Sequence, residues 1–212
     1  MNWSVEAICT GLAVPFNGAE RSAIAKHPTP GPLRINRDGF EVDEQADRKV
    51  HGGPEMAVHL YPLDHHDFWT GMLMGHALLA EPGAFGSNLA VRGIDEEQVC
   101  IGDRFQLGSA VLEISQARQP CWKVEHRFQR KGMVAAIIET GRSGWYFRVL
   151  EEGVAQAGDT LHRIEQGHED WSVARVFETI FAPDTSNEDL AAVANLERLS
   201  PNHRERARMR LA

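Results

Sequence analysis

The segment Arg104-Phe105-Gln106-Leu107-Gly108-Ser109-Ala110-Val111-Leu112-Glu113-Ile114 decides the expected fold. Two short strand-like runs flank Gly108-Ser109, and a glycine that opens a two-residue loop predicts a hairpin with a type II′ turn. A Gly-Asp pair precedes the first run at Gly102-Asp103, and Gly158-Asp159 likewise precedes the strand-like residues 160–164. Repeated Gly-Asp turns feeding short strands favour a strongly bent sheet, so we expect a closed or partly closed β-barrel core.

The first two thirds of the chain otherwise read as further short strands with a few helices. Residues 5–13 and 22–26 are expected strands. Apolar residues at helical spacing predict helices over 62–74 and 133–140, and Gly141 is a natural residue to end the second helix.

After about residue 165 the pattern becomes helical. Residues 173–181 carry an apolar stripe that ends before Pro183, and residues 190–196 carry a second stripe. Ser200-Pro201 is a good N-cap and first-turn pair for a third helix running toward Leu211. We therefore expect an α+β, mainly β protein: a barrel domain with peripheral helices over residues 1–166, and a small three-helix appendage over 167–212.

Bulk composition narrows the classes of function. The chain has 212 residues, 42% hydrophobic and 25% charged, and its net charge of −8 argues against general affinity for nucleic acid or an anionic membrane. The N-terminus lacks a signal-peptide pattern, and no stretch approaches the ~20 apolar residues of a membrane span. Three scattered cysteines make no disulfide framework, so we expect a soluble protein of the reducing cytoplasm.

The candidate reactive group is the thiol of Cys121, within Ser115-Gln116-Ala117-Arg118-Gln119-Pro120-Cys121-Trp122-Lys123. Pro120 fixes the backbone before the thiol, and Arg118 and Lys123 place two cations near it. Positive charge lowers a thiol's pKa, and a thiolate suits a soft, sulfur-rich metal centre. The alternative is a small buried packing residue, which is how we interpret Cys9 and Cys100.

The chain resembles MOSC domain proteins, named after the C-terminal part of molybdenum cofactor sulfurases, and in particular the bacterial YiiM-like branch. Each matching motif is weak alone, but their order and spacing cover most of the chain. Besides the Cys121 stretch, the matches are Ser22-Ala23-Ile24-Ala25-Lys26, Asp43-Glu44-Gln45-Ala46-Asp47, Lys49-Val50-His51-Gly52-Gly53-Pro54, Phe85-Gly86-Ser87-Asn88-Leu89 and Thr140-Gly141-Arg142-Ser143-Gly144-Trp145.

This resemblance implies a barrel that binds molybdenum cofactor through Cys121 as the metal's protein ligand. It also implies reduction of N-hydroxylated compounds such as hydroxylaminopurines and amidoximes, and suggests a homodimer. The cofactor carries a dithiolene and a phosphate, so it needs hydrogen-bond donors and cations. The expected donors are Lys26, Lys49, His51, Asn88, Arg118 and Arg142.

The sequence also departs from the family pattern. Val42 stands where a glycine is usual, Ser87 where a glutamate is common, and Ala117 where a proline is common. The missing carboxylate at Ser87 puts an acid/base role there in doubt, whereas Asn88 can still hydrogen-bond the pterin.

Two neighbouring motifs leave alternatives open. Paired glycines beside Lys49 and His51 favour a ligand loop over a plain turn, and His51 would position substrate or pass a proton. Asp43, Glu44 and Asp47 form an acidic run, which is usually a solvated surface but can also accept hydrogen bonds from pterin amino groups.

Two other clusters have plainer interpretations. His59, His65 and His66 match no established zinc spacing, and surface positions are favoured over a zinc site. The four arginines 204, 206, 208 and 210 fit a helix end favoured by the macrodipole better than a nucleic-acid arm.

Three functions follow, in order of preference. The first is a molybdenum-dependent reductase, whose electrons come from a separate protein because the chain lacks a dinucleotide fingerprint and an iron–sulfur cysteine cluster. The second is a sulfur-carrier or cofactor-delivery module with a persulfide on Cys121, and the third a Cys–His hydrolase using Cys121 and His51. Pyridoxal phosphate is not expected, because the chain has no room for the sulfurase fold that binds it.

Overall fold

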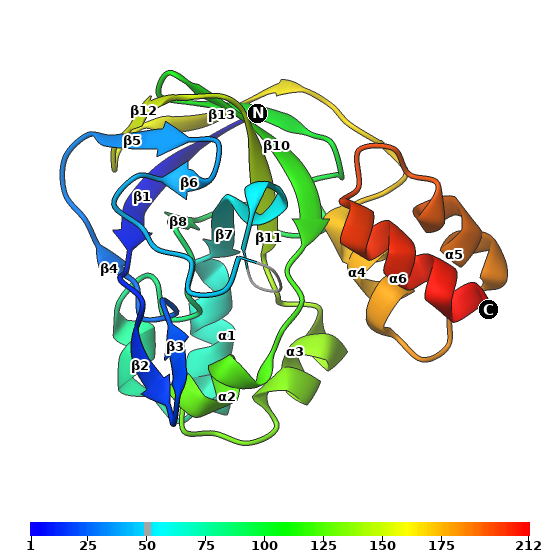
Figure 1. Cartoon of the computed structure of the whole chain (residues 1–212), viewed down its shortest axis with the longest axis horizontal. Coiled ribbons are helices and arrows are strands. Elements are labelled where there is room, and N and C mark those ends of the chain that lie inside the picture. Colours follow the sequence, from blue (N-terminus) through cyan, green and yellow to red (C-terminus); the bar gives the residue numbers. More distant parts are fainter. Residues whose placement is uncertain (49–51) are drawn as a thin grey trace.

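A closed ring of seven strands forms the centre of the molecule, seen at the top of Figure 1. The computed structural model describes residues 1–48 and 52–212. Every neighbouring pair in the ring is antiparallel except the parallel pair β7–β8, and pairing of β13 with β1 closes it. In order, the strands are β13 (Thr160–Glu165), β9 (Arg104–Leu107), β10 (Ala110–Ala117), β11 (Trp145–Glu151), β7 (Val58–Pro62), β8 (Leu89–Val91) and β1 (Asn2–Thr10). The expected barrel is therefore closed.

The β9–β10 hairpin is confirmed. Leu107 pairs with Ala110 across Gly108-Ser109, and Gly108 has a φ of 56°. A side chain at Gly108 would overlap the Val154 carbonyl oxygen, so the position requires glycine for space as well as for conformation. The hairpin side chains Phe105, Leu107, Leu112 and Ile114 are fully buried in the core.

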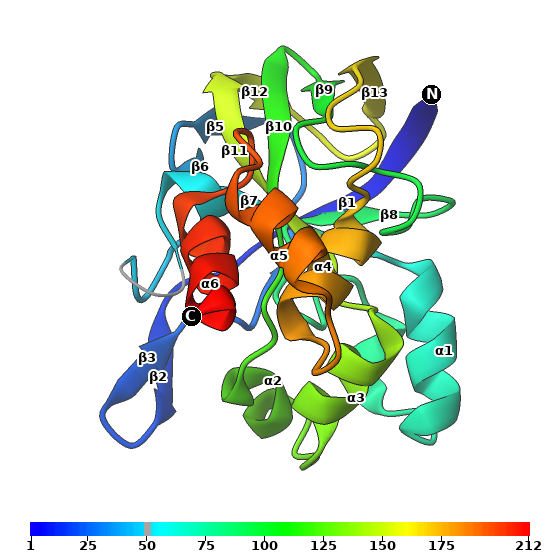
Figure 2. The same cartoon turned by 90° about the vertical axis from the view of Figure 1, so that its right-hand side faces the viewer.

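Several shorter strands lie outside the seven-stranded ring. A three-stranded sheet contains β12 (Gly153–Ala155), β5 (Leu33–Asn36) and β6 (Gly39–Phe40), and β4 (His27–Pro28) pairs with β1. The hairpin β2 (Val14–Asn17) and β3 (Glu20–Ser22) projects from the body of the molecule (Figure 2). The expected strand over 22–26 is wrong beyond Ser22, because the chain turns tightly there and the Lys26 N–H donates to the Ile24 carbonyl.

Three helices lie at one end of the barrel, below the strands in Figure 1. The helices α1 (Asp64–Met72) and α3 (Met133–Thr140) were expected, and the left-handed Gly141 ends α3. The six-residue α2 (Trp122–Arg127) was not expected. The short 3₁₀ helices are η1 (Pro54–Met56) and η2 (Ala77–Ala80). Among the described residues, every helix is too short or too polar to traverse a lipid bilayer.

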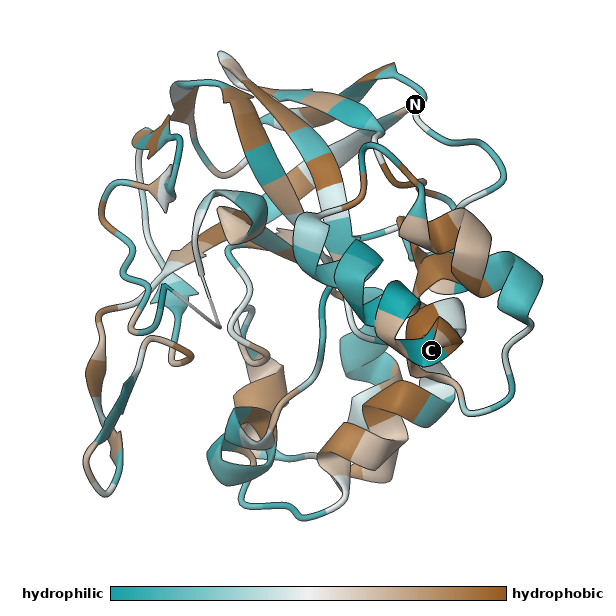
Figure 3. Cartoon of the chain, turned by 45° about the vertical axis from the view of Figure 1, so that its right-hand side comes forward, coloured by the Kyte–Doolittle hydropathy of each residue, from teal (hydrophilic) through white to brown (hydrophobic). Residues whose placement is uncertain are grey.

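The C-terminal helices α4 (Val173–Phe181), α5 (Asn187–Ala194) and α6 (Pro201–Leu211) form a group on one side of the barrel (Figure 1). Serine caps each of them, and the Ser200 side chain accepts from the N–H of His203 as expected. Most of α6 is hydrophilic in Figure 3, and only His203 and Ala207 are buried. The division into domains at residue 166/167 remains a prediction.

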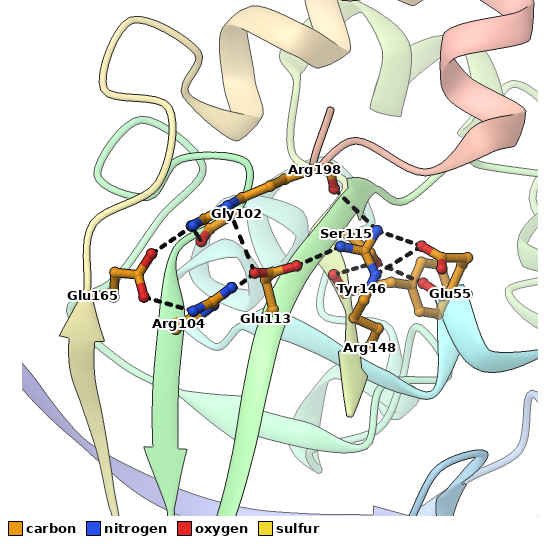
Figure 4. A network of polar contacts seen from close by, with 9 residues as sticks. All are labelled: Glu55, Gly102, Arg104, Glu113, Ser115, Tyr146, Arg148, Glu165 and Arg198. Atoms are coloured by element: carbon orange, nitrogen blue, oxygen red, sulfur yellow. Dashed lines mark hydrogen bonds and ion pairs between the residues drawn. The ribbon is translucent and has the colours of Figure 1, made fainter. Parts of the chain in front are cut away.

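A polar network joins the barrel wall to the segment that enters α6 (Figure 4). The buried carboxylate of Glu113 on β10 accepts from Arg104 Nε at 2.8 Å and from Arg148 Nη1 at 2.6 Å. Arg148 also donates to Glu55 in η1 and to the carbonyl of Arg198. Arg198 in turn donates to Glu165 and to the Gly102 carbonyl. The network therefore fixes η1, the barrel and the C-terminal helices to one another.

Candidate functional site

Cys121 lies where the chain leaves β10 and enters α2. It is the N-cap residue of α2, with an extended backbone, and its side chain is partly exposed to a cavity. Burial raises the pKa of Cys9 to about 12 and that of Cys100 to about 11, so those two thiols are poorly suited to ionise. Cys121 is thus the thiol placed to meet a ligand, while Cys9 packs in a small apolar cluster and the Cys100 thiol donates to the Glu169 carbonyl.

A cavity lies beside Cys121. It holds about 720 Å³ of atom-free space, counting the solvent at its mouth. It collects residues from segments far apart in the sequence, including the acidic run 43–47, Ser22 to Ile24, Phe85-Gly86 and the segment around Cys121. Four of the expected site residues line it: Lys26, Asn88, Arg118 and Cys121.

Arg118 is one of the buried cations of this cavity. Its backbone N–H donates to the Gly144 carbonyl, which fixes the residue just beyond β10. One guanidinium nitrogen, Nη2, lies 3.5 Å from the Phe85 carbonyl, whereas Nη1 is buried without a hydrogen-bond partner among the described residues. An unused N–H of a buried guanidinium favours an anionic or strongly accepting ligand.

Lys26 and Asp43 form a buried ion pair at the same cavity. Burial lowers the pKa of Lys26, and the Asp43 carboxylate opposes that shift. Asp43 also accepts from the Gly11 N–H at 2.8 Å and from Asn88 Nδ2 at 2.8 Å. Asp43 is therefore part of the cavity wall, and the interpretation of this residue as a solvated surface group is wrong.

The Asn88 amide is already occupied by protein partners. Its Nδ2 donates to the Cys9 carbonyl and to Asp43, and its Oδ1 accepts from the His59 N–H at 3.0 Å. Asn88 thus braces the Lys26–Asp43 pair.

His59 is a neutral group in the wall. Burial, together with the charge of Arg118, lowers its pKa to about 3. The centre of its ring lies 4.8 Å from the centre of the Tyr146 ring, and both residues line the cavity. Nε2 of His59 has no hydrogen-bond partner among the described residues.

A buried carboxylate that the sequence did not single out, Glu96, supports this arrangement. It accepts from the N–H groups of Ser143 and Gly144 at 3.0 and 2.7 Å, and His65 Nε2 lies 2.7 Å from its other oxygen. Glu96 thereby fixes the loop whose carbonyl binds the Arg118 N–H.

The expected surface position of the histidines is wrong. His59, His65 and His66 are all buried, and His66 Nδ1 bonds the Leu79 carbonyl. The described residues contain no cluster of three or more His, Cys, Asp or Glu side chains that would hold a metal ion.

Three expected site residues are not placed in the cavity. Arg142 does not line it within the described part of the chain; its guanidinium lies 4.1 Å from the centre of the Phe68 ring and donates to the Thr140 carbonyl. Lys49 and His51 lie outside the described residues. Conversely, Gln119, Lys123 and Tyr146 line the cavity without having been proposed as ligands. For Gln119 and Lys123 the available signal was their place in the Cys121 segment.

Comparisons with known proteins identify the family of this chain. The family model "MOSC domain" matches residues 47–162. YiiM of Escherichia coli is 35% identical over 159 residues, covering 75% of this chain and 71% of that protein. A protein of Gibberella moniliformis named "Reductase" is 39% identical over 182 residues, and they span 85% of this chain but only 32% of that protein. The crystal structure of YiiM from Geobacillus stearothermophilus superposes with a TM-score of 0.84 at 29% identity, over 99% of this chain and 100% of that one.

Proposed function

Because the chain belongs to the MOSC domain family, on its YiiM-like branch, we propose that it binds molybdenum cofactor and reduces N-hydroxylated compounds. The observation that carries the proposal is the pairing of two groups in one cavity. The Cys121 thiol supplies a soft ligand, and the unpartnered Nη1 of Arg118 supplies a buried cation. A sulfur-rich metal group that also bears an anionic tail requires both.

The described residues divide the binding task between them. Cys121 would hold the metal, and Arg118 would neutralise negative charge beside it. Lys26 is held in place by Asp43, so it offers its remaining N–H donors from a fixed position. The carboxylates of Asp43 and Glu44 border the same space and accept backbone N–H groups of Gly11 and Ala13. The wall thus presents cations and carboxylates together, as a ligand with both phosphate and amino groups requires.

The overall reaction breaks an N–O bond with two electrons and two protons: R–NH–OH becomes R–NH₂ and water. The bound cofactor supplies the two-electron redox chemistry, while the chain holds and orients the reactants. The electron pair comes from a separate redox protein in this proposal. A proton-passing role for His51 remains a prediction outside the described residues. A fungal relative named as a reductase supports the reaction class.

Metal analysis tests the proposal directly. Protein purified from a host that makes the cofactor should contain about one molybdenum per chain, and Cys121→Ser should lose it. Cys100→Ala is the matched control, because this buried thiol lies away from the cavity and should leave the metal content unchanged. The loaded wild type should reduce benzamidoxime with an artificial electron donor.

The sulfur-carrier alternative gives a different result in the same experiment. Wild-type protein would then lack molybdenum, carry a cyanide-labile sulfur on Cys121, and turn over no amidoxime. That combination would replace the reductase proposal.

A further inference from the structure

A second cavity lies on the other side of Cys121, between the barrel and α6. It holds about 1080 Å³ of atom-free space, counting open solvent. Four residues border both cavities: Met56, Gln119, Cys121 and Tyr146. The candidate metal ligand therefore stands in a wall that is shared by two chambers.

The deep end of the second cavity carries buried polar atoms. Gln116 is 4% exposed, and its Oε1 has no hydrogen-bond partner among the described residues. His203 is 3% exposed, and its Nε2 also has no partner in the described part of the chain. Burial lowers the pKa of His203 to about 4, so its ring is neutral at pH 7. Buried polar atoms of this kind normally have partners, and here a ligand can provide them.

The outer wall of this cavity is one face of α6. Asn202, Glu205, Arg206 and Met209 line it, and their spacing of three, four and seven residues places them on the same side of the helix. The helix is anchored elsewhere by its arginines: Arg208 donates to the Ala194 carbonyl, and Arg210 to those of Thr179 and Ile180. These arginines anchor α6 from positions outside the cavity lining.

The lining carries one side chain of each charge, Glu205 and Arg206. Glu205 pairs with Arg208 at 3.2 Å, and the Arg206 guanidinium lies 4.7 Å from the centre of the Phe181 ring. The other polar groups are the amides of Gln116, Gln119 and Asn202, the neutral ring of His203, the Tyr146 hydroxyl and the Cys121 thiol. A buried carbonyl oxygen such as Oε1 of Gln116 accepts hydrogen bonds and cannot donate them.

We propose that this second cavity is the substrate chamber of the enzyme, and that it takes uncharged molecules that donate a hydrogen bond through N–H or O–H. The substrate would reach the reactive centre from the α6 side, while the first cavity holds the cofactor. Asn202 and Met209 would then determine which substrates fit. This inference rests on the proposed reductase function.

Narrowing the chamber tests the idea. Met209 is 65% exposed, so Met209→Trp fills the outer part of the cavity without disturbing the core. Leu211→Trp is the matched control, because Leu211 is 38% exposed on the same helix and does not line the cavity. With benzamidoxime as the probe, we expect Met209→Trp to raise KM about tenfold or more through steric exclusion, with kcat and molybdenum content little changed. Leu211→Trp should match the wild type.

A binding measurement tests ligand chemistry separately from turnover. In calorimetric titrations of the loaded protein, benzamidoxime should bind, and Met209→Trp should weaken that binding about tenfold. Pyridine N-oxide, which has no hydrogen-bond donor, should bind at least about tenfold more weakly than benzamidoxime. Equal KM and equal affinity in the two tryptophan variants would overturn the assignment of the chamber, and tight binding of pyridine N-oxide would overturn its ligand chemistry.

The two proposals fail in different ways. A molybdenum-loaded wild type that reduces no N-hydroxylated compound contradicts the proposed function, whatever the titrations give. A wild type that reduces benzamidoxime while Met209→Trp leaves both KM and affinity unchanged contradicts only the substrate chamber.

Discussion

The network around Glu113 gives a prediction whose size can be worked out from its contacts. Glu113→Gln keeps the shape of the side chain but removes the negative charge between Arg104 and Arg148. The amide nitrogen of glutamine also faces a guanidinium, so one arginine N–H loses its acceptor. Removing one partner of a buried ion pair costs about 3–5 kcal/mol when nothing compensates.

Compensation lowers that figure here. After the substitution Arg148 still pairs with Glu55, and Arg104 still pairs with Glu165. The arginine side chains are also 18% and 33% exposed, so water reaches them in part. We therefore expect the free energy of unfolding to fall by about 2 kcal/mol. For a chain of this size that corresponds to a Tm lower by about 4–8 °C.

Urea unfolding and calorimetry of Glu113→Gln measure this loss. Glu165→Gln is the matched control, because Glu165 bonds Arg104 and Arg198 in the same network but is 40% exposed. Its substitution should cost clearly less, and 1 M NaCl should weaken its effect more than that of Glu113→Gln. Equal losses for the two variants, or a loss below about 0.5 kcal/mol at Glu113, would refute the assignment of stability to the buried carboxylate.

Two further predictions concern stability. The folded-state pKa of His203, about 4, lies below the unfolded value of 6.5. The contribution of the neutral ring to the free energy of unfolding is therefore fully present above pH 6.5 and is lost as the pH falls toward 4. Urea unfolding at pH 7.5 and at pH 5 measures this. From the higher to the lower pH, the free energy of unfolding of the wild type should fall by about 2 kcal/mol more than that of His203→Leu, and parallel pH profiles would contradict the prediction. Gly144→Ala should lower the Tm much more than Gly141→Ala. Both glycines have positive φ, but only a methyl group added at Gly144 would overlap the Leu60 carbonyl. Equal Tm shifts of the two variants in thermal scans would count against that overlap.

The parts of the fold that the sequence predicted are those specified by local signals. A glycine turn between short apolar runs predicted the β9–β10 hairpin, and an apolar stripe predicted α4 over its full length. The six residues of α2 are too few to display a helical period, so the sequence pattern did not predict this helix. The tight turn after Ser22 likewise depends on contacts that the strand-like residues 23–26 do not reveal.

The candidate site was predicted only in part, because long-range contacts complete it. The position of Arg118 near Cys121 in the sequence and the family motif that contains Lys26 predicted these two cations as site residues. Both line the cavity beside Cys121. His65 was mistaken for a surface residue because its partner Glu96 lies 31 positions away along the chain. Arg142 belongs to a matching motif, yet its side chain lies over Phe68, a contact that a one-dimensional pattern does not contain.

The residues shared by the two cavities have a consequence for how the proposed enzyme would diverge. Replacement of Tyr146 alters both cavities at once, so under the proposed assignment a new substrate preference gained there would also change the cofactor cavity. Asn202 and Met209 border only the chamber beside α6. Natural variation and laboratory selection for altered substrate range should therefore accumulate on the terminal helix, while the barrel side changes little.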